Sequence, residues 1–165
     1  MSVEFQRRLL HNTPVFGGVA DAILDLILER GSVVSVAQNE FFFQEGDRER
    51  SAFVLESGRV SVLKHWQNKS YLLRRLHAGA CFGEMTWIDL RPREASARAD
   101  EDCRALCFTA DTLQEIYRRD LEQFTLIYMN MARELSRRLR EADKRLFEAK
   151  VNASISLSGY MFESS

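Results

Sequence analysis

The sequence has few of the residues that crosslink chains or bind metal ions. Its 165 residues include only three cysteines, Cys81, Cys103 and Cys107. An odd number of cysteines in no small-scaffold pattern argues against a disulfide framework and indicates a reducing compartment. Cys103 and Cys107 would face one side of a predicted strand, which would suit metal or redox work, but no third or fourth ligand clusters near them. We therefore expect core thiols and no bound metal.

Long apolar runs and a strong net charge are also missing. The longest apolar stretch, residues 22–28, contains Asp25 and is far too short to span a bilayer. The N-terminus has no apolar signal segment. A net charge of −1 provides no overall attraction to nucleic acid or to an anionic membrane. These absences predict a soluble, cytoplasmic protein that does not act at a membrane.

Histidine is as scarce as cysteine, and this limits the case for enzymatic chemistry. The three histidines, His11, His65 and His77, are scattered along the sequence. None adjoins both a nucleophile and a carboxylate, which hydrolytic catalysis requires together. We therefore expect that the protein is not an enzyme.

Proline and glycine, although few, divide the first thirty residues into two helices. A short helix is predicted over residues 4–12, and Thr13-Pro14 interrupts it because the residue before proline avoids helical geometry. A second helix over 19–29 places apolar residues at helical spacing, and Gly31 follows as a stop.

From residue 32 onward, short apolar runs with a period of two replace the helical pattern. Turn residues such as Gly46-Asp47 and Ser57-Gly58 separate these runs, and residues 66–70 predict a hairpin. Short strands at spacings of about ten residues predict a β-sandwich or a barrel-like roll. The strand candidates are 33–36, 41–43, 52–55, 59–65, 70–76, 96–99 and 104–108.

Helical spacing returns after Thr109, which is a suitable N-cap. A long helix is predicted over residues 121–149, and its apolar seam could pack on the protein's own roll or form a dimer. We expect a parallel homodimer through residues 124–147, because the helix extends past what a small roll could cover. The apolar positions are Phe124, Ile127, Tyr128, Met131, Leu135, Leu139, Ala142 and Leu146.

The segment 82–97 combines groups that could bind a small anion. Glu84 follows Gly83 and stands nine residues before Arg93, which follows Pro92. A planar guanidinium suits phosphate, and a carboxylate can accept hydrogen bonds from ribose hydroxyls, so the pair would read a compact nucleotide. A turn that carries a surface ion pair is the alternative that spacing alone leaves open.

These residues resemble the cyclic-nucleotide-binding domain family, the β-roll module of catabolite activator protein and of protein kinase A regulatory subunits. The resemblance covers about residues 12–147. It implies a mainly β fold with flanking α: a double-stranded β-helix (a jelly-roll-like β-roll) with N-terminal helices and a long C-terminal helix. The matching motifs are Thr13-Pro14-Val15-Phe16, Phe43-Gln44-Glu45-Gly46-Asp47, the strand–turn–strand 53–62, the phosphate-binding cassette 82–95 and Met131-Ala132-Arg133-Glu134-Leu135.

The resemblance implies cAMP or cGMP as the ligand and gives the cassette residues their roles. Glu84 would accept a hydrogen bond from the ribose 2′-hydroxyl, and Arg93 would clamp the cyclic phosphate. The backbone N–H groups of Gly83, Glu84 and Met85 would line the sugar-phosphate pocket, since glycine allows close approach. The long helix would cover the base and bring Arg138 near it, where a guanidinium could stack on a purine. A solvated helix face is the alternative for Arg138.

Two features depart from the family pattern. The family usually has Ser, Thr or Ala after the arginine, whereas this chain has Glu94, followed by Ala95. If Glu94 faced the pocket about 5 Å from the phosphate, repulsion would cost on the order of 3 kcal/mol at an effective dielectric of about 20. Glu94 could instead pair with Arg93 or turn toward solvent. Trp87 stands where the family commonly has leucine, and it either narrows the pocket or belongs to the core.

We therefore expect a cyclic-nucleotide-binding sensor or regulatory domain that transmits occupancy through its C-terminal helix. The alternatives are a scaffold or dimerisation module with a vestigial pocket, and a regulatory domain of a larger transporter or kinase. About 15 residues follow Lys150, too few for a DNA-reading domain, so this chain alone is not expected to bind DNA. The expected divisions are N-terminal helices over 1–30, the β-roll over 31–110, C-terminal helices over 111–150 and a flexible tail over 151–165.

Overall fold

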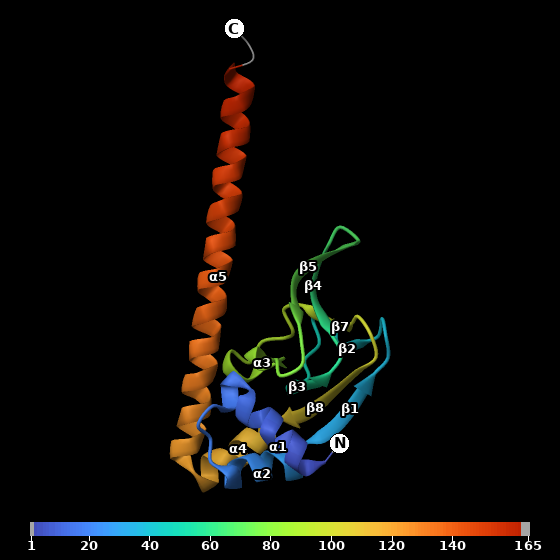
Figure 1. Cartoon of the computed structure of the whole chain (residues 1–165), viewed down its shortest axis with the longest axis vertical. Coiled ribbons are helices and arrows are strands. Elements are labelled where there is room, and N and C mark those ends of the chain that lie inside the picture. Colours follow the sequence, from blue (N-terminus) through green and yellow to red (C-terminus); the bar gives the residue numbers. More distant parts are fainter. Residues whose placement is uncertain (1, 163–165) are drawn as a thin grey trace. The chain divides into compact units, whose positions relative to one another are not determined.

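The computed structural model describes the backbone of residues 2–162 and the side chains of residues 2–153. Its strands form two four-stranded antiparallel sheets, ordered β1-β8-β3-β6 and β2-β7-β4-β5 (Figure 1). The predicted β-roll with flanking helices is therefore confirmed. The strands are β1 Ser32–Val36, β2 Phe41–Phe43, β3 Ser51–Ser57, β4 Val60–Trp66, β5 Lys69–Leu76, β6 Cys81–Phe82, β7 Ser96–Ala99 and β8 Cys103–Thr109.

Capping residues, proline and glycine set the ends of the N-terminal helices. Helix α1 (Val3–Asn12) is capped by the Ser2 side chain, which accepts a hydrogen bond from the Phe5 amide at 3.3 Å. It stops at Thr13, and Pro14 opens the short 3₁₀ helix η1 (Pro14–Phe16). Helix α2 (Asp21–Arg30) ends immediately before Gly31. Both predicted helices are thus confirmed, with boundaries shifted by one or two residues.

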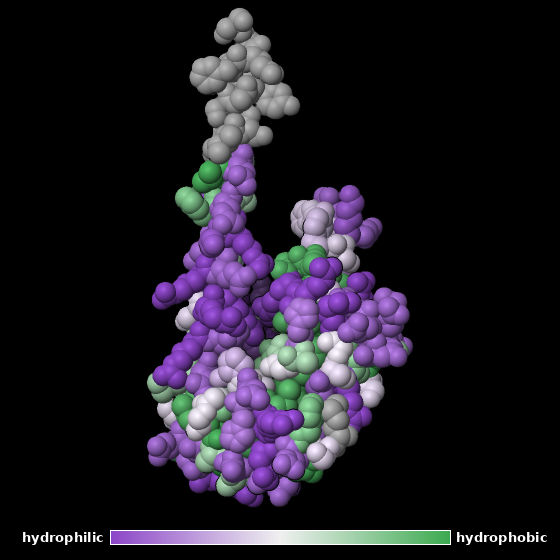
Figure 2. Space-filling model, in the orientation of Figure 1, coloured by the Kyte–Doolittle hydropathy of each residue, from purple (hydrophilic) through white to green (hydrophobic). Residues whose placement is uncertain are grey.

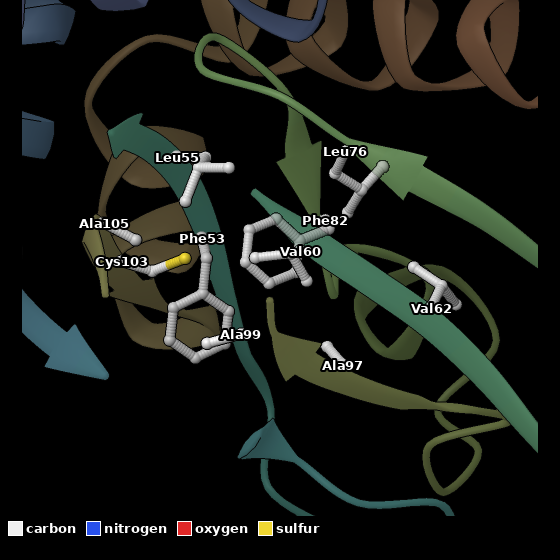
Figure 3. Close-up of a cluster of buried hydrophobic side chains, with 10 residues drawn as sticks. All are labelled: Phe53, Leu55, Val60, Val62, Leu76, Phe82, Ala97, Ala99, Cys103 and Ala105. Atoms are coloured by element: carbon white, nitrogen blue, oxygen red, sulfur yellow. The ribbon is translucent and has the colours of Figure 1, made fainter. Parts of the chain in front are cut away.

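The roll encloses an apolar core to which both sheets contribute (Figure 3). Phe53 and Leu55 come from β3, while Val60 and Val62 come from β4 of the other sheet. Phe42 packs edge-on against Phe53, with ring centroids 5.3 Å apart. The run Phe41-Phe42-Phe43 therefore supplies core aromatics, although Phe41 itself is exposed. Burying such rings contributes apolar area and favourable edge-to-face geometry.

The helices cover the opposite face of the sheet that contains β3 and β8. Phe108 of β8 lies 5.5 Å from the Phe16 ring of η1 and 5.4 Å from the Trp87 ring, measured between centroids. Strand β3 is consequently buried on both faces from Ser51 to Glu56. This explains its continuous apolar run, because alternation is lost when both faces of a strand are covered.

The cysteines lie in or beside this core. Cys81 and Cys103 are buried, Cys107 is half-buried, and all three are free thiols. Burial raises the pKa of the Cys103 and Cys107 thiols, so both stay protonated at neutral pH. Cys103 and Cys107 both pack on the core cluster from one face of β8, as their spacing predicted.

The hairpin expected at residues 66–70 is also confirmed. Strands β4 and β5 pair antiparallel up to Trp66 and Lys69. The two residues between them, Gln67 and Asn68, have φ angles of 46° and 60°. Positive φ at both central positions is the requirement of a type I′ turn, whose twist matches that of the strands it joins.

Two helices follow the roll, α4 (Ala110–Arg119) and α5 (Leu121–Phe162). The chain divides into two compact units, Met1–Asn130 and Met131–Ser165, and the division falls inside α5. In the first unit, the buried Asn130 side chain donates to the carbonyl oxygens of Val15 at 3.2 Å and Gly17 at 2.9 Å. The first turns of α5 are thereby held to the N-terminal segment.

The second unit contains the rest of α5, which is longer than expected. The helix continues to Phe162, whereas the sequence suggested an end near residue 149 and a loose tail beyond it. No proline occurs in residues 151–162, so nothing removes a backbone donor there. Residues 163–165 of the expected tail lie outside the described residues. Every described side chain from 139 to 153 is exposed, and Figure 2 shows this stretch as mostly hydrophilic with a small hydrophobic group near its end.

The turn before β4 yields a stability prediction. Gly58 has φ +93°, and a Cβ there would lie 2.6 Å from the Cys103 sulfur and 2.8 Å from the Asp102 carbonyl oxygen. Gly58→Ala is expected to lower the free energy of unfolding by about 3 kcal/mol, the sum of backbone strain and overpacking. Gly79→Ala is the matched control, because Gly79 has φ +88° but open space around it. It should cost only about 1 kcal/mol in urea denaturation. Equal losses would show that the clash at Gly58 is relieved without cost.

Candidate functional site

The cassette expected from the sequence connects the two sheets. It leaves β6 at Phe82, passes through Gly83 and Glu84 into the short helix α3 (Met85–Ile88), and returns as β7. Gly83 has φ +84°, a conformation that glycine adopts without strain. Trp87 closes the turn with a backbone hydrogen bond to the Glu84 carbonyl at 3.0 Å. Neither β6 nor α3 was predicted from periodicity, since each is too short to show a period.

Arg93 is the central side chain of this segment and is only 4% exposed. Its Nη1 donates to the Gly83 carbonyl at 2.6 Å, and its Nη2 donates to the Ser51 carbonyl at 2.5 Å. Nη2 also reaches the Ser51 hydroxyl at 3.2 Å. The guanidinium carbon lies 4.0 Å from the centroid of the Phe43 ring, a cation–π distance. Arg93 therefore joins β2, β3 and the start of the cassette.

One donor of this guanidinium is not used. The Arg93 Nε atom is buried and has no hydrogen-bond partner among the described residues. Burial lowers the pKa of Arg93, while the carboxylates of Glu49, Asp47 and Glu84 act in the opposite direction. The ordinary pKa of arginine is so high that the group remains charged. The site thus presents a buried positive charge with one unsatisfied N–H, and an anionic oxygen would match both.

The loop between β2 and β3 holds the backbone of Arg93 in place. The Gly46 amide donates to the Arg93 carbonyl at 2.8 Å, and the Arg93 amide donates to the Asp47 carbonyl at 2.8 Å. The Glu45 amide donates to the Ser96 hydroxyl at 2.9 Å. These reciprocal bonds fix the approach of the side chain without using its charge.

Close packing around Arg93 explains the glycine at position 83. A Cβ on Gly83 would lie 2.8 Å from Arg93 Nη1 and 2.9 Å from the Ser51 carbonyl oxygen. Any side chain at this position would displace the guanidinium or the strand. The sequence indicated close backbone approach here, but it did not indicate that the approaching group is Arg93 itself.

The other predicted cassette residues surround this centre. Glu84 is buried, with 1% exposure, and its charge acts on Arg93. Met85 is 37% exposed, and Ala95 is half-buried against the core cluster. The structure therefore brings Gly83, Glu84 and Arg93 together, with Met85 and Ala95 on the adjoining backbone.

Glu94, the main departure from the family pattern, is exposed. The backbone carbonyl of Glu94 accepts a hydrogen bond from Lys64 Nζ at 2.6 Å, and the same ammonium pairs with the Glu45 carboxylate at 2.6 Å. The guanidinium of Arg93 is directed to Gly83 and Ser51 instead of to Glu94. Of the placements left open by the sequence, the solvent-facing one agrees with this exposure.

Trp87 belongs to the core. It is 5% exposed, its ring packs on Phe108, and its Nε1 donates to the Arg50 carbonyl at 3.0 Å. A buried indole usually requires such a partner for its N–H. This contact decides between the two roles that the sequence left open for Trp87.

Arg138 lies in the second unit, within α5. There its Nε donates to Glu134 at 3.2 Å, and Arg137 also pairs with Glu134. These are helix-surface pairs of the i,i+4 and i,i+3 type. The contact between Arg138 and a base stays a prediction.

Two residues of the site were missed by sequence reasoning. The sequence predicted Phe43 only as part of a strand and a turn motif, although its ring also supports the Arg93 guanidinium. Ser51 was not noticed, because its contact goes mainly through the backbone carbonyl, which any residue type could supply. Only the aromatic character of Phe43 left a usable signal.

Neither a metal centre nor a membrane segment emerges from the described part of the chain. Among the side chains of residues 2–153, no group of three or more His, Cys, Asp or Glu could hold a metal ion. None of the described helices has the length and apolar character needed to cross a bilayer.

Comparison with known proteins gives a consistent result. The family model described as "Cyclic nucleotide-binding domain" matches residues 33–120. The "Cyclic AMP receptor protein" of Thermus thermophilus is 33% identical over 138 residues, which are 83% of this chain and 62% of that relative. The chain thus spans less than two thirds of the length of this curated relative.

Solved structures with the same fold include a cyclic nucleotide-binding domain and a regulatory domain. A cyclic nucleotide-binding domain from Methylobacillus flagellatus superposes with a TM-score of 0.76 and 22% identity, covering 87% of this chain and 82% of that one. The regulatory domain of Toxoplasma gondii PKA, solved with cAMP, gives a TM-score of 0.65 and 19% identity, covering 68% and 43%. At these identities the likeness establishes the fold alone.

The contacts of Arg93 predict that its side chain stabilises the fold, in addition to any role in binding a ligand. Arg93→Ala is expected to lower the free energy of unfolding by about 3 kcal/mol, because buried carbonyls lose charged hydrogen bonds. Arg91→Ala is the matched control, since Arg91 is an exposed arginine of the same loop. It should change stability by less than about 0.5 kcal/mol in urea denaturation. Similar midpoints for both variants would contradict a structural role for Arg93.

Proposed function

Because the chain belongs to the cyclic nucleotide-binding domain family, we propose that it is a regulatory domain that binds a cyclic nucleotide at its 82–95 cassette. The observation that carries the proposal is the buried guanidinium of Arg93 with its unsatisfied Nε. A cyclic phosphate carries one negative charge and exposed oxygens, which would pair with this group. The relative solved with cAMP supports a ligand of the same class.

Each neighbouring residue has a proposed task. Glu84 accepts hydrogen bonds from ribose hydroxyls, and the amides of Gly83, Glu84 and Met85 line the sugar-phosphate. The ring face of Phe43 packs against the Arg93 guanidinium and supports it. Ala95 and the exposed Glu94 border the site. The ligand is cAMP or cGMP, and cAMP is favoured by the relatives named above.

Occupancy is proposed to be reported through α5. This helix starts in the first unit, where Asn130 ties it to the N-terminal segment, and continues as the second unit. A ligand can shift this helix only if it binds one placement more tightly than another. The proposed signal is therefore a difference in nucleotide affinity between two placements of the first turns of α5.

A second candidate is a scaffold with a vestigial pocket, and one observation favours it. Two nitrogens of Arg93 are already bonded to the chain's own carbonyls, so a phosphate must compete with Gly83 and Ser51. Glu94 adds a negative charge next to the site. In this alternative, the Arg93 contacts serve the fold alone and no nucleotide binds.

Titration calorimetry with cAMP and cGMP tests the proposal. The parent chain is expected to release or absorb heat with at least one of them. Arg93→Ala should weaken binding about a hundredfold, because charge-assisted hydrogen bonds to the phosphate are lost. Glu84→Gln should weaken it about tenfold while preserving shape. Arg91→Ala is the control and should bind as the parent does. No heat from either nucleotide at millimolar concentration would sink the proposal.

The same titration separates the two candidates through Glu94→Ser. If the parent binds no nucleotide and Glu94→Ser binds one, the pocket is vestigial and Glu94 prevents nucleotide binding. If both bind, with Glu94→Ser tighter, the pocket is functional and Glu94 tunes its affinity by repulsion.

A parallel homodimer through residues 124–147 is proposed as the partner arrangement. Leu139 and Leu146 are seven residues apart on α5, and they are 62% and 56% exposed. Phe147 is 68% exposed beside them. Most helical stability in proteins comes from packing of an apolar face, so an exposed apolar stripe favours a partner that covers it. A second copy of the helix would bury this stripe in heptad register.

Sedimentation equilibrium tests this arrangement. The double variant Leu139→Ala/Leu146→Ala should weaken the dimer at least about a hundredfold, since each buried leucine contributes roughly 2 kcal/mol or more. Arg140→Ala/Lys144→Ala changes the same helix at two exposed polar positions and should leave the dimer intact. A parent chain that sediments as a monomer at all concentrations would refute the dimer.

A further inference from the structure

A cavity lies in the first unit, and none of the cassette residues with a proposed ligand role lines it. It has a volume of about 330 Å³ and is formed where α3, α4 and the start of α5 meet the residue before β3. Small-molecule sites commonly have volumes of about 300–1,000 Å³. The cavity is therefore at the lower end of the range that holds a single small ring system.

Aromatic rings form much of its wall. The ring of Phe124 lies 5.1 Å from that of Tyr117 and 4.5 Å from that of Tyr128, measured between centroids. Trp87 also lines the cavity, and its own N–H is already used by the Arg50 carbonyl. Rings arranged in this way offer stacking surfaces for a flat ligand. Aliphatic ligands would gain less from such a wall.

Polar side chains stand at the rim of the same cavity. They are Arg50, Asp111 and Gln114, and all three are exposed. In the described part of the chain, none of the three side chains makes a hydrogen bond or an ion pair. One is cationic, one is anionic and one is a neutral amide, so their charges cancel. Together they offer donors and acceptors without selecting for a charged ligand.

We propose that this cavity binds a neutral planar heteroaromatic ring of the nucleobase class. Such a ring has stacking faces for the aromatic wall and an edge with both donors and acceptors for the rim. Gln114 can donate and accept, Arg50 can donate to ring nitrogen or oxygen, and Asp111 can accept from a ring N–H. The proposal goes beyond nucleotide binding at the cassette and does not depend on it.

The cavity contains its own reporter, Trp87. The second tryptophan, Trp66, is 65% exposed on the β4–β5 hairpin. In a Trp66→Phe background, all tryptophan emission therefore comes from Trp87. Adenine is the probe, because it has the ring and the polar edge but neither the sugar nor the phosphate that the cassette would read. Adenine is expected to change the Trp87 emission in a saturable way.

Matched variants locate the binding. Tyr117→Ala should weaken adenine binding about tenfold, the effect of losing one stacking surface. Tyr71→Ala is the control, because Tyr71 on β5 is 49% exposed, similar to 52% for Tyr117. It should leave binding unchanged. Gln114→Ala should weaken binding several-fold through the lost edge contacts.

Three results would overturn the proposal. The first is the absence of any saturable change at millimolar adenine in a chain that circular dichroism shows to be folded. The second is equal weakening in Tyr117→Ala and Tyr71→Ala. The third is that Arg93→Ala loses adenine binding while Tyr117→Ala keeps it. This result would assign the ring to the cassette. Failure of cAMP or cGMP to bind leaves these outcomes unaffected, so the two proposals are tested separately.

Discussion

A guanidinium buried among backbone carbonyls is the contact on which the cassette depends. Arg93 comes from the loop before β7, bonds to Ser51 on β3 and to Gly83 after β6, and stacks on Phe43 of β2. These strands belong to both sheets, so one side chain links them. Charged hydrogen bonds of this kind are stronger than neutral ones, and leaving the carbonyls unpaired would carry a desolvation penalty. The shape of the cassette and the position of its charge are thus set by the same bonds.

This arrangement also explains how the buried charge of Arg93 is tolerated. The carboxylates of Glu49, Asp47 and Glu84 act on Arg93 through space, while carbonyl oxygens supply its direct contacts. Burying a charge is costly unless it is surrounded by such groups. An anion bound at the proposed site would therefore have to compensate for weakened internal bonds. The binding free energy of the anion would be the difference between Arg93 bonded to the anion and Arg93 bonded to the chain's own carbonyls. A small difference of this kind would be sensitive to a single charge such as that of Glu94.

The sequence predicted the helices and strands that show a periodic residue pattern. It missed the features that depend on contacts between residues far apart in the sequence. The strands 41–43 and 96–99 coincide with β2 and β7, because an apolar run in the first, alternation in the second and the flanking turns define them locally. Strand β6 and helix α3 are too short to carry a period. Trp87 could be placed only once Phe108 and the Arg50 carbonyl were known to lie beside it. Ser51 contributes through its carbonyl, which leaves no mark on residue type. The predicted end of the long helix near residue 149 was wrong, since α5 continues to Phe162 and no proline interrupts residues 151–162.

The close approach of Arg93 to Gly83 has a consequence for how such a domain can diverge. A Cβ at position 83 would fall 2.8 Å from Nη1 of Arg93, so the glycine accommodates the arginine as much as it does the turn. A descendant that lost the arginine would still have the Ser51 carbonyl oxygen 2.9 Å from that Cβ, and the positive φ of the position would remain. Loss of the arginine alone would therefore not open position 83 to a side chain, because strand β3 requires the glycine independently of the buried charge.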